Sequence, residues 1–310
     1  MNHQEIPFQC PRCSSSIDWQ AGHCSSCSGQ VKLKDGIINF IMSGTISDQE
    51  KSEIKLHATL APEYGKRYDH EFSRIYSDYW NKQFLDFLPT GCDMVLDCGC
   101  GTGDLTRSLL ARSRKVVGMD ISQDMILQGK KLFRRWHEIT WVSCPGETLP
   151  FADNIFDAVC FRGALHHMAH EEKALGEAHR VLKPGGRLLL SEPNDDSLLL
   201  RLPRMIVNRK MARFGNDHKA FRSVPWLNSI SAAGFTVLYT KYFSYLSQPL
   251  CGMSDLLPIM KYLPMSGSIA KGLVAFDELC SRLPLMRSQS FDLFVCAEKK
   301  AGRPVQEPAD

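Results

Sequence analysis

Downstream of residue 93, short hydrophobic runs alternate with longer stretches in which apolar residues recur every three or four positions. The runs predict buried strands, and the longer stretches predict helices, for example over 104–111, 123–137 and 224–233. The predicted strands cover 94–97, 115–120, 139–143, 156–161, 187–191, 235–242 and 291–297. Strands that alternate with helices in this way form a parallel sheet with helices on both faces. We therefore expect an α/β fold with a doubly wound, seven-stranded, mostly parallel sheet.

The segment before this sheet is expected to be a linker followed by two helices. Residues 43–50 are polar, which is typical of a linker. The second helix is expected over 62–87, where aromatic and aliphatic residues recur at spacings of three, four and five and would face the core. At the other end, residues 301–310 carry two prolines and no periodicity. They are expected to be a disordered tail.

Composition and charge narrow the class of protein. Of 310 residues, 44% are hydrophobic and 23% are charged, which excludes disordered, collagen-like and coiled-coil chains. The 37 basic and 34 acidic residues nearly balance, so the net charge does not indicate a nucleic-acid or membrane partner. Residues 1–8 lack the features of a secretory signal, and no run of about 18 apolar residues predicts a membrane span. We expect a cytoplasmic protein.

Four of the twelve cysteines form two Cys-x-x-Cys pairs near the N-terminus. They are Cys10, Cys13, Cys24 and Cys27. Clustered cysteines in a reducing compartment usually bind metal, and two such pairs can complete a tetrahedral site. We predict structural Zn²⁺, because four thiolates leave no open position; the metal would supply on the order of 10 kcal/mol of folding energy. The alternatives are His23 as a ligand, redox dithiols and an iron–sulfur cluster.

The other eight cysteines mostly lie in apolar, strand-like stretches and are expected to fill the core. They are Cys92, Cys98, Cys100, Cys144, Cys160, Cys251, Cys280 and Cys296.

A glycine-rich loop follows the first predicted strand of the sheet. Gly99, Gly101 and Gly103 come directly after Asp97, with the spacing G-x-G-x-G rather than the dinucleotide-binding G-x-G-x-x-G. Glycines at the carboxyl end of a strand let the backbone approach a ligand closely. A carboxylate at this place repels phosphate and suits a cationic ligand. A second acid, Asp120, ends the next strand, where it can accept hydrogen bonds from ribose hydroxyls.

Residues 95–192 resemble class I methyltransferases that use S-adenosylmethionine, in particular the type 11 group that includes ubiquinone and menaquinone biosynthesis enzymes. Besides the loop and Asp120, three strings match in the family's order: Gly-Glu-Thr-Leu-Pro-Phe at 146–151, Leu-His-His at 165–167 and Arg-Val-Leu-Lys-Pro-Gly-Gly-Arg at 180–187. The resemblance implies a Rossmann-like fold, S-adenosylmethionine as cofactor, and methyl transfer as the activity.

The resemblance also implies roles for the residues of the loop and of the two acids. Gly99, Gly101 and Gly103 would line the methionine part of the cofactor, and Asp97 would lie near its amino group. Asp120 would bind the ribose.

At the adenine, Ile121 would pack against the ring. The family usually has an Asp two residues before the Glu of the third loop, and Pro145 stands there in this chain. Gly146 and Glu147 are expected to make the adenine contact instead.

Further residues are expected to face the cofactor or the methyl acceptor. Phe161 and Arg162 follow the fourth strand, and Tyr64 and Tyr68 would close over the cofactor from the preceding helix, as similar tyrosines do in relatives. His166 or His167 would be a general base, with local hydrogen bonding as the alternative role.

Residues 10–40 resemble the small zinc ribbons that serve as activator subunits of some methyltransferases and that also occur fused in front of such domains. The expected organisation is a zinc ribbon over 1–42, a linker and N-terminal helices over 43–90, and a methyltransferase domain over 91–300. That domain carries insertions near 196–222 and 246–286, and the tail covers 301–310.

The insertions are expected to choose the acceptor. The stretch 198–222 is rich in Arg and Lys, and 246–285 is apolar, with Met253, Met260 and Met265. They would form a lid over a small apolar or lipid-linked acceptor, with the basic residues at an anionic substrate or at the inner face of the membrane. The alternative is a solvated basic helix over an ordinary core.

Two competing functions are an RNA methyltransferase that recognises RNA through its ribbon, and a non-catalytic partner that binds the cofactor. The ribbon has three basic and three acidic residues over 1–45, which disfavours a nucleic-acid partner. The intact glycine loop disfavours the non-catalytic reading.

Overall fold

The structure is a computed structural model that describes residues 6–17, 19–41, 46–67, 69–133, 135–198, 220–254 and 257–300. Three predictions therefore lie wholly or mostly outside the described residues: the role of Tyr68, the basic stretch within 199–219, and the tail at 301–310.

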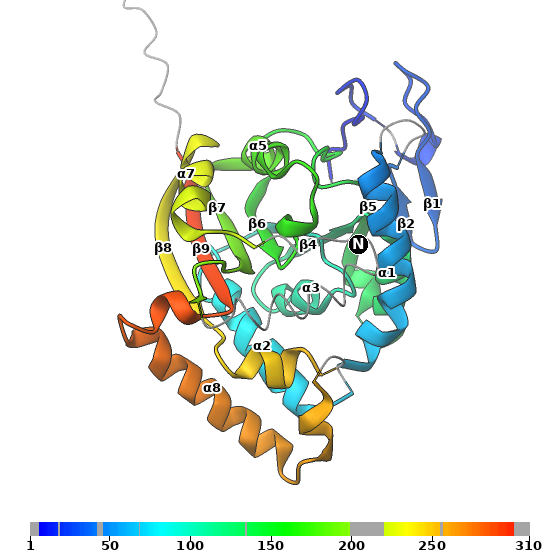
Figure 1. Ribbon diagram of the computed structural model, residues 1–310. Coiled ribbons are helices and arrows are strands. Elements are labelled where there is room, and N and C mark those ends of the chain that lie inside the picture. Colours follow the sequence, from blue (N-terminus) through cyan, green and yellow to red (C-terminus); the bar gives the residue numbers. More distant parts are fainter. Residues whose placement is uncertain are drawn as a thin grey trace, which may run out of the picture.

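A single mixed sheet forms the centre of the described part of the chain (Figure 1). Its strand order is β1-β2-β5-β4-β3-β6-β7-β9-β8. The strands are β1 Lys32–Lys34, β2 Ile37–Asn39, β3 Met94–Cys98, β4 Lys115–Asp120, β5 Ile139–Ser143, β6 Phe156–Arg162, β7 Leu182–Pro193, β8 Phe235–Phe243 and β9 Asp292–Lys299. The last seven are the predicted strands, and the α/β prediction is confirmed. The pairs β2–β5, β5–β4, β4–β3, β3–β6 and β6–β7 are parallel, whereas β9 is antiparallel to both of its neighbours.

Helices cover both faces of the sheet. They are α1 Asp48–Arg67, α2 Glu71–Leu85, α3 Asp104–Leu109, α4 Gln123–Leu132, α5 Glu171–Val181, α7 Ser223–Ala232 and α8 Ser266–Arg282. One core cluster contains residues of α5 and α7, and a second contains residues of α2, α3 and α8. All five residues of β3 are buried, as expected for a strand with helices on both sides.

One helix boundary was predicted wrongly. The sequence pattern placed a helix over 62–87, but α1 continues through Pro62 to Arg67 and α2 begins at Glu71. Pro62 is exposed within α1. The interruption instead lies between Arg67 and Glu71, so the residues on either side belong to two separate helices.

The N-terminal cysteine-rich segment joins the main sheet. Its strand β2 runs parallel to β5, with Ile37 opposite Trp141, and β1 continues the sheet beyond it. A second attachment involves Phe8, whose ring lies 5.3 Å from that of Phe40 and 5.6 Å from that of Phe151, measured between centroids. The two strands of this segment therefore extend the predicted seven-stranded sheet to nine strands within the described residues.

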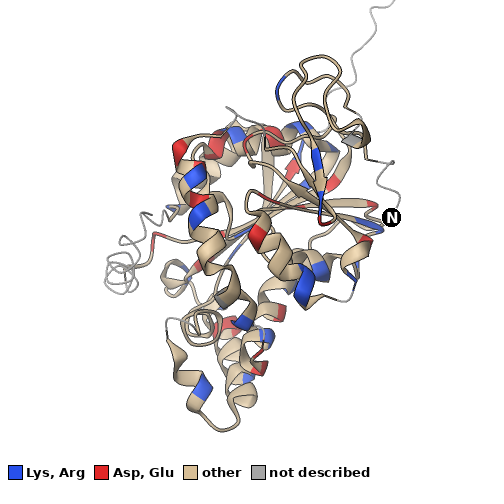
Figure 2. Cartoon of the chain, turned by 90° about the vertical axis from the view of Figure 1, so that its right-hand side faces the viewer, with Lys and Arg blue, Asp and Glu red and all other residues tan. Residues whose placement is uncertain are grey.

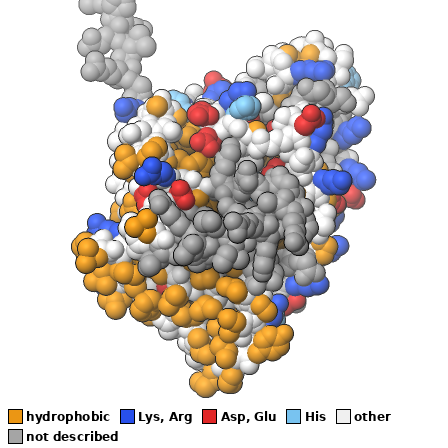
Figure 3. Space-filling view, in the orientation of Figure 1, with side chains coloured by type: hydrophobic (Ala, Val, Ile, Leu, Met, Phe, Trp, Pro, Cys, Tyr) orange, Lys and Arg blue, Asp and Glu red, His pale blue; other side chains and the backbone are white. Residues whose placement is uncertain are grey.

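The predicted apolar insertion is largely helical. It contains the π-helical turn η6 Gln248–Gly252, the 3₁₀ helix η7 Pro258–Tyr262 and α8, which packs against α2. Many of its large hydrophobic side chains are exposed and gather at the lower end of the face drawn in Figure 3. No helix among the described residues is both long and apolar enough to span a bilayer.

Candidate active site

A cavity of about 250 Å³ opens at the carboxyl ends of β3, β4 and β6, beside α1. It brings together most of the residues that the sequence singled out for cofactor or acceptor contact. Those that line it are Tyr64, Gly99, Gly101, Asp120, Ile121, Gly146, Glu147, Arg162 and His167. Asp97, Gly103, Phe161 and His166 lie outside this lining.

The glycine loop has the tight conformation that its sequence predicts. Gly99 has φ +73°, and a Cβ placed there would lie 2.4 Å from the Cβ of Ala164. Gly103 has φ +79° and precedes the first residue of α3; a Cβ there would lie 2.7 Å from the Trp141 ring. Both positions therefore exclude residues that carry a Cβ. At Gly99 the added atom would clash with the loop after β6, and at Gly103 it would clash with β5.

Asp120 holds the loop in place and faces the cavity. Its Oδ2 accepts a hydrogen bond of 2.7 Å from the Gly101 amide, and its Oδ1 accepts one of 2.8 Å from the Ser122 amide. Burial raises the pKa of this carboxyl, against the opposing effect of the charge on His57 and of the two amides. A carboxylate oxygen has more than one lone pair, so each oxygen can accept a further hydrogen bond from a ligand.

Asp97 lies behind the loop rather than in the cavity wall. It is 1% exposed, and its Oδ2 accepts a 2.6 Å hydrogen bond from the Thr106 hydroxyl of α3. Burial raises its pKa to about 7. In this structure its direct role is to join the end of β3 to the first turn of α3.

The side of the cavity beyond Asp120 is formed by Ile121, Cys144, Gly146 and Glu147. The Oε1 of Glu147 accepts a 3.0 Å hydrogen bond from the Ala169 amide, so this side chain also holds the loop that follows β6. Burial raises the pKa of Glu147.

Arg162, at the end of β6, is held in the opposite wall. Its Nη1 lies 2.8 Å from Asp104 Oδ2, and its guanidinium carbon lies 4.4 Å from the centre of the Trp80 ring. Trp80 in turn donates a 2.7 Å hydrogen bond from Nε1 to Ser191 Oγ. Phe161, one residue earlier, is fully buried in the core.

Two cavity residues from α1, Tyr64 and Arg67, stack on each other. The Arg67 guanidinium carbon lies 4.0 Å from the centre of the Tyr64 ring. They form the part of the wall nearest to the end of α1.

The two candidate bases have different surroundings. His166 Nδ1 lies 2.6 Å from Glu192 Oε2, a fully buried carboxylate that also accepts hydrogen bonds from the backbone amides of 164 and 165. His167 faces the cavity, and its Nδ1 lies 3.6 Å from Glu53 Oε2. Burial lowers the pKa of His167 to about 4, so its ring is neutral near pH 7.

Several residues of the cavity carried no sequence signal of their own. Glu53, His57 and Arg67 come from α1, Trp80 comes from α2, and Asp104 begins α3. Glu53 and His57 are four residues apart and so share one helix face, but nothing local indicates that this face meets His167.

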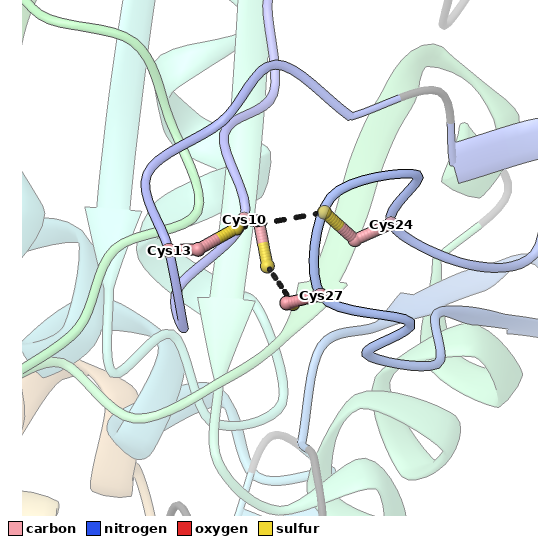
Figure 4. A group of neighbouring side chains, drawn as sticks. All are labelled: Cys10, Cys13, Cys24 and Cys27. Carbon is pink, nitrogen blue, oxygen red and sulfur yellow. Dashed lines mark hydrogen bonds between the residues drawn. The ribbon is translucent and has the colours of Figure 1, made fainter.

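The four N-terminal cysteines converge at one point (Figure 4). Cys10 Sγ lies 3.5 Å from Cys27 Sγ, and Cys13 Sγ lies 3.6 Å from Cys24 Sγ. Thiolates around a tetrahedral Zn²⁺, each about 2.3 Å from the ion, stand roughly 3.8 Å apart. The cluster is therefore compatible with zinc. The other eight cysteines are free thiols, of which all but the half-buried Cys100 are buried.

Comparison with protein families matches residues 96–190 to the family described as a methyltransferase domain. This segment runs from β3 into β7 and contains the glycine loop, Asp120 and His167. It has the Rossmann-like fold of class I methyltransferases.

Two curated relatives are similar to this chain. The ubiquinone/menaquinone biosynthesis C-methyltransferase UbiE of Escherichia fergusonii is 40% identical over 104 residues, which cover 32% of this chain and 41% of that protein. The demethylmenaquinone methyltransferase of Tropheryma whipplei is 37% identical over 115 residues, which cover 37% of this chain and 48% of that protein. The chain spans less than half the length of either relative.

Two solved structures have a similar fold over most of this chain. An S-adenosylmethionine-dependent methyltransferase from Thermotoga maritima covers 80% of this chain and 99% of its own, with a TM-score of 0.54 and 19% identity. The [4+2]-cyclase SpnF covers 74% of this chain and 81% of its own, with a TM-score of 0.52 and 22% identity. Since proteins with different named activities share this fold, the reaction must be argued from the cavity.

Proposed function

We propose that this protein is an enzyme that transfers a methyl group from S-adenosylmethionine to a small apolar or lipid-linked acceptor. The observation that carries the proposal is that the glycine loop and Asp120 line one cavity within a segment that matches a methyltransferase domain. The names of the two curated relatives support a quinone-type acceptor, an apolar ring with oxygen substituents.

The donors and acceptors around the cavity suit this cofactor. Asp120 retains lone pairs for the ribose hydroxyls, and the half-buried Ile121 offers an apolar surface to adenine. Glu50, Glu53 and Glu147 also line the cavity, and their charges favour a cationic ligand over a phosphate. Bound S-adenosylmethionine would supply a methyl group on a positively charged sulfur.

The chain's own contribution is then to position the acceptor and exclude water. Transfer requires the acceptor atom to approach the methyl group in line with the departing sulfur, so a rigid wall provides much of the acceleration. Arg162, fixed between Asp104 and Trp80, forms such a wall. His167 is our candidate to accept a proton from the acceptor, whereas His166 would position the loop through Glu192.

The apolar insertion supports an acceptor that resides in a lipid surface. Ten large hydrophobic side chains between 257 and 285 are at least 37% exposed, among them Tyr262 at 80% and Leu285 at 91%. Lys261, Lys271 and Arg282 are exposed in the same stretch. The two acids within 257–285 are engaged elsewhere: Asp277 is buried and Glu278 pairs with Lys241. Charges of both signs are interspersed over the rest of the molecule (Figure 2). An apolar surface with basic residues suits an anionic membrane.

Calorimetric titration with S-adenosylmethionine and with its demethylated product tests the cofactor. Binding of both is expected. If well-folded protein bound neither compound, methyl transfer would be contradicted and this fold would have another function.

Incubation with labelled cofactor and fractionated cell extract tests the acceptor. We expect label in the organic-soluble fraction. Label in RNA would instead support the ribbon as an RNA-recognition module, and label in neither fraction under binding conditions would favour a non-catalytic partner.

Flotation with vesicles containing anionic lipid tests the surface. The wild-type protein and L33E, which alters an exposed leucine of β1, should float. L285E should remain at the bottom, because a charge in the apolar surface opposes insertion. Equal flotation of both variants would contradict the proposal that this surface contacts the membrane.

A further inference from the structure

A cluster of three possible metal ligands lies in the cavity wall, apart from the four cysteines. Glu53 and His57 stand four residues apart on α1, and His167 belongs to the 3₁₀ turn η4 Leu165–His167 after β6. Glu53 Oε2 lies 3.3 Å from His57 Nε2 and 3.6 Å from His167 Nδ1. All three ligand atoms lie within 4.8 Å of one another.

These separations are close to those within a metal site. Nitrogen and oxygen ligands about 2.0–2.2 Å from a tetrahedral zinc ion stand roughly 3.3–3.6 Å apart. Two of the three pairs have nearly this spacing, and the two imidazole nitrogens lie within 4.8 Å of each other. The rings already meet edge to face, with centroids 5.3 Å apart. The three side chains are therefore close enough to share one ion.

We propose that Glu53, His57 and His167 form a second metal site, one that binds zinc or another divalent transition-metal ion. Two histidines and one carboxylate are a ligand set of zinc sites that keep a fourth position open. The set favours transition metals over Mg²⁺ and Ca²⁺, which prefer oxygen ligands.

The position of the cluster gives such an ion a place in the proposed reaction. All three residues line the cavity that contains Gly101 and Asp120, so the open position faces that cavity. It would take water or an oxygen of the acceptor, such as the hydroxyl of a phenol or quinol. The ion would also tie α1 to the loop after β6, two segments far apart in the sequence. A ligated His167 no longer accepts a proton, so the ligand and base roles of this residue are alternatives.

Zinc content per chain, measured by mass spectrometry of metals after zinc loading and extensive dialysis, tests the proposal. Wild-type protein should retain about two zinc ions, one at the cysteines and one here, whereas E53Q and H167N should each retain about one. The control H170N alters an exposed histidine three residues beyond His167 and should retain about two.

A wild-type protein that retains one zinc ion, lost on substitution of Cys13, would overturn the proposal. So would E53Q and H167N proteins that retain as much zinc as the wild type. Circular dichroism of each variant establishes that it is folded. Binding of S-adenosylmethionine by the wild-type protein is measured separately by calorimetry. The zinc content therefore tests the metal site, and the cofactor titration tests the proposed function.

Discussion

At the scale of single residues, the two acids of the glycine-loop motif have different surroundings. Asp120 faces the cavity and contacts the backbone of the loop, whereas Asp97 lies behind the loop and contacts α3. The sequence could indicate both as acids at strand ends. It could not separate them, because the distinction depends on which side of the loop each carboxyl occupies.

Substitution of Asp120 by Asn should weaken binding of S-adenosylmethionine about 10- to 100-fold, since it removes a charged hydrogen-bond acceptor at the ribose position. Calorimetry measures the affinity. The control D124N changes an exposed acid in the first turn of α4 and should bind as the wild type does. Equal affinities for D120N and the wild type would contradict the assignment.

Substitution of Asp97 by Asn should make the protein more stable, and increasingly so as pH rises from about 4 to about 7. Burial raises the folded-state pKa of Asp97 from 3.8 to about 7, so over this interval the unfolded chain ionises first and the wild type loses stability. Above pH 7 the difference in free energy of unfolding between D97N and the wild type should stay constant. Urea unfolding of both proteins at pH 5 and pH 8 measures it, and identical differences at the two pH values would refute the buried-carboxyl explanation.

At the scale of elements, strong local patterns predicted the structure well. The strands β3 and β6 contain the apolar runs 94–96 and 158–161, and the glycine loop between β3 and α3 follows from its residue types. The helix boundary near Pro62 was wrong because the apolar spacing over 62–87 continues across the break between Arg67 and Glu71. The approach of Glu53 to His167 could not be predicted, since it arises from how α1 packs against the folded domain.

The contact between α4 and the glycine loop gives a prediction at this scale. A Cβ at Gly129 would lie 2.2 Å from the backbone oxygen of Thr102, within the loop. Substitution of Gly129 by Ala should therefore destabilise the protein by about 1–3 kcal/mol and weaken cofactor binding.

The matched control is Gly176 of α5, where an added Cβ meets nothing within 4 Å. Substitution of Gly176 by Ala should stabilise the protein by up to about 1 kcal/mol, because alanine favours helix. Thermal unfolding measures both variants. A G129A protein as stable as G176A would show that α4 can move away from the loop at little cost.

At the scale of the whole molecule, the N-terminal cysteine-rich segment and the segment that matches a methyltransferase domain share a sheet and a core. Phe8 and Phe40 belong to the first core cluster together with Phe151 and residues of β3, β4 and β6. For protein loaded with zinc at the cysteines, we expect one cooperative unfolding transition, in which release of the metal coincides with loss of tryptophan fluorescence.

Substitution of Phe8 by Ala should lower the midpoint of that single transition, because the free energy of unfolding falls by about 3–5 kcal/mol. Denaturant titration followed by a zinc-sensitive dye and by fluorescence measures the two signals together. Zinc release at a clearly lower denaturant concentration would show that the N-terminal cysteine-rich segment unfolds as an independent unit.

The pairing of β2 with β5 also determines how safely the chain could be shortened. A protein without residues 1–41 would present the main-chain amides and carbonyls of Ile139–Ser143 to solvent as an open edge, next to the apolar side chains of Trp141 and Val142. Open edges of this kind recruit strands from other molecules. We therefore expect the N-terminal segment to protect this edge from self-association. A shortened protein should be recovered mainly as aggregates even if its cofactor cavity is intact.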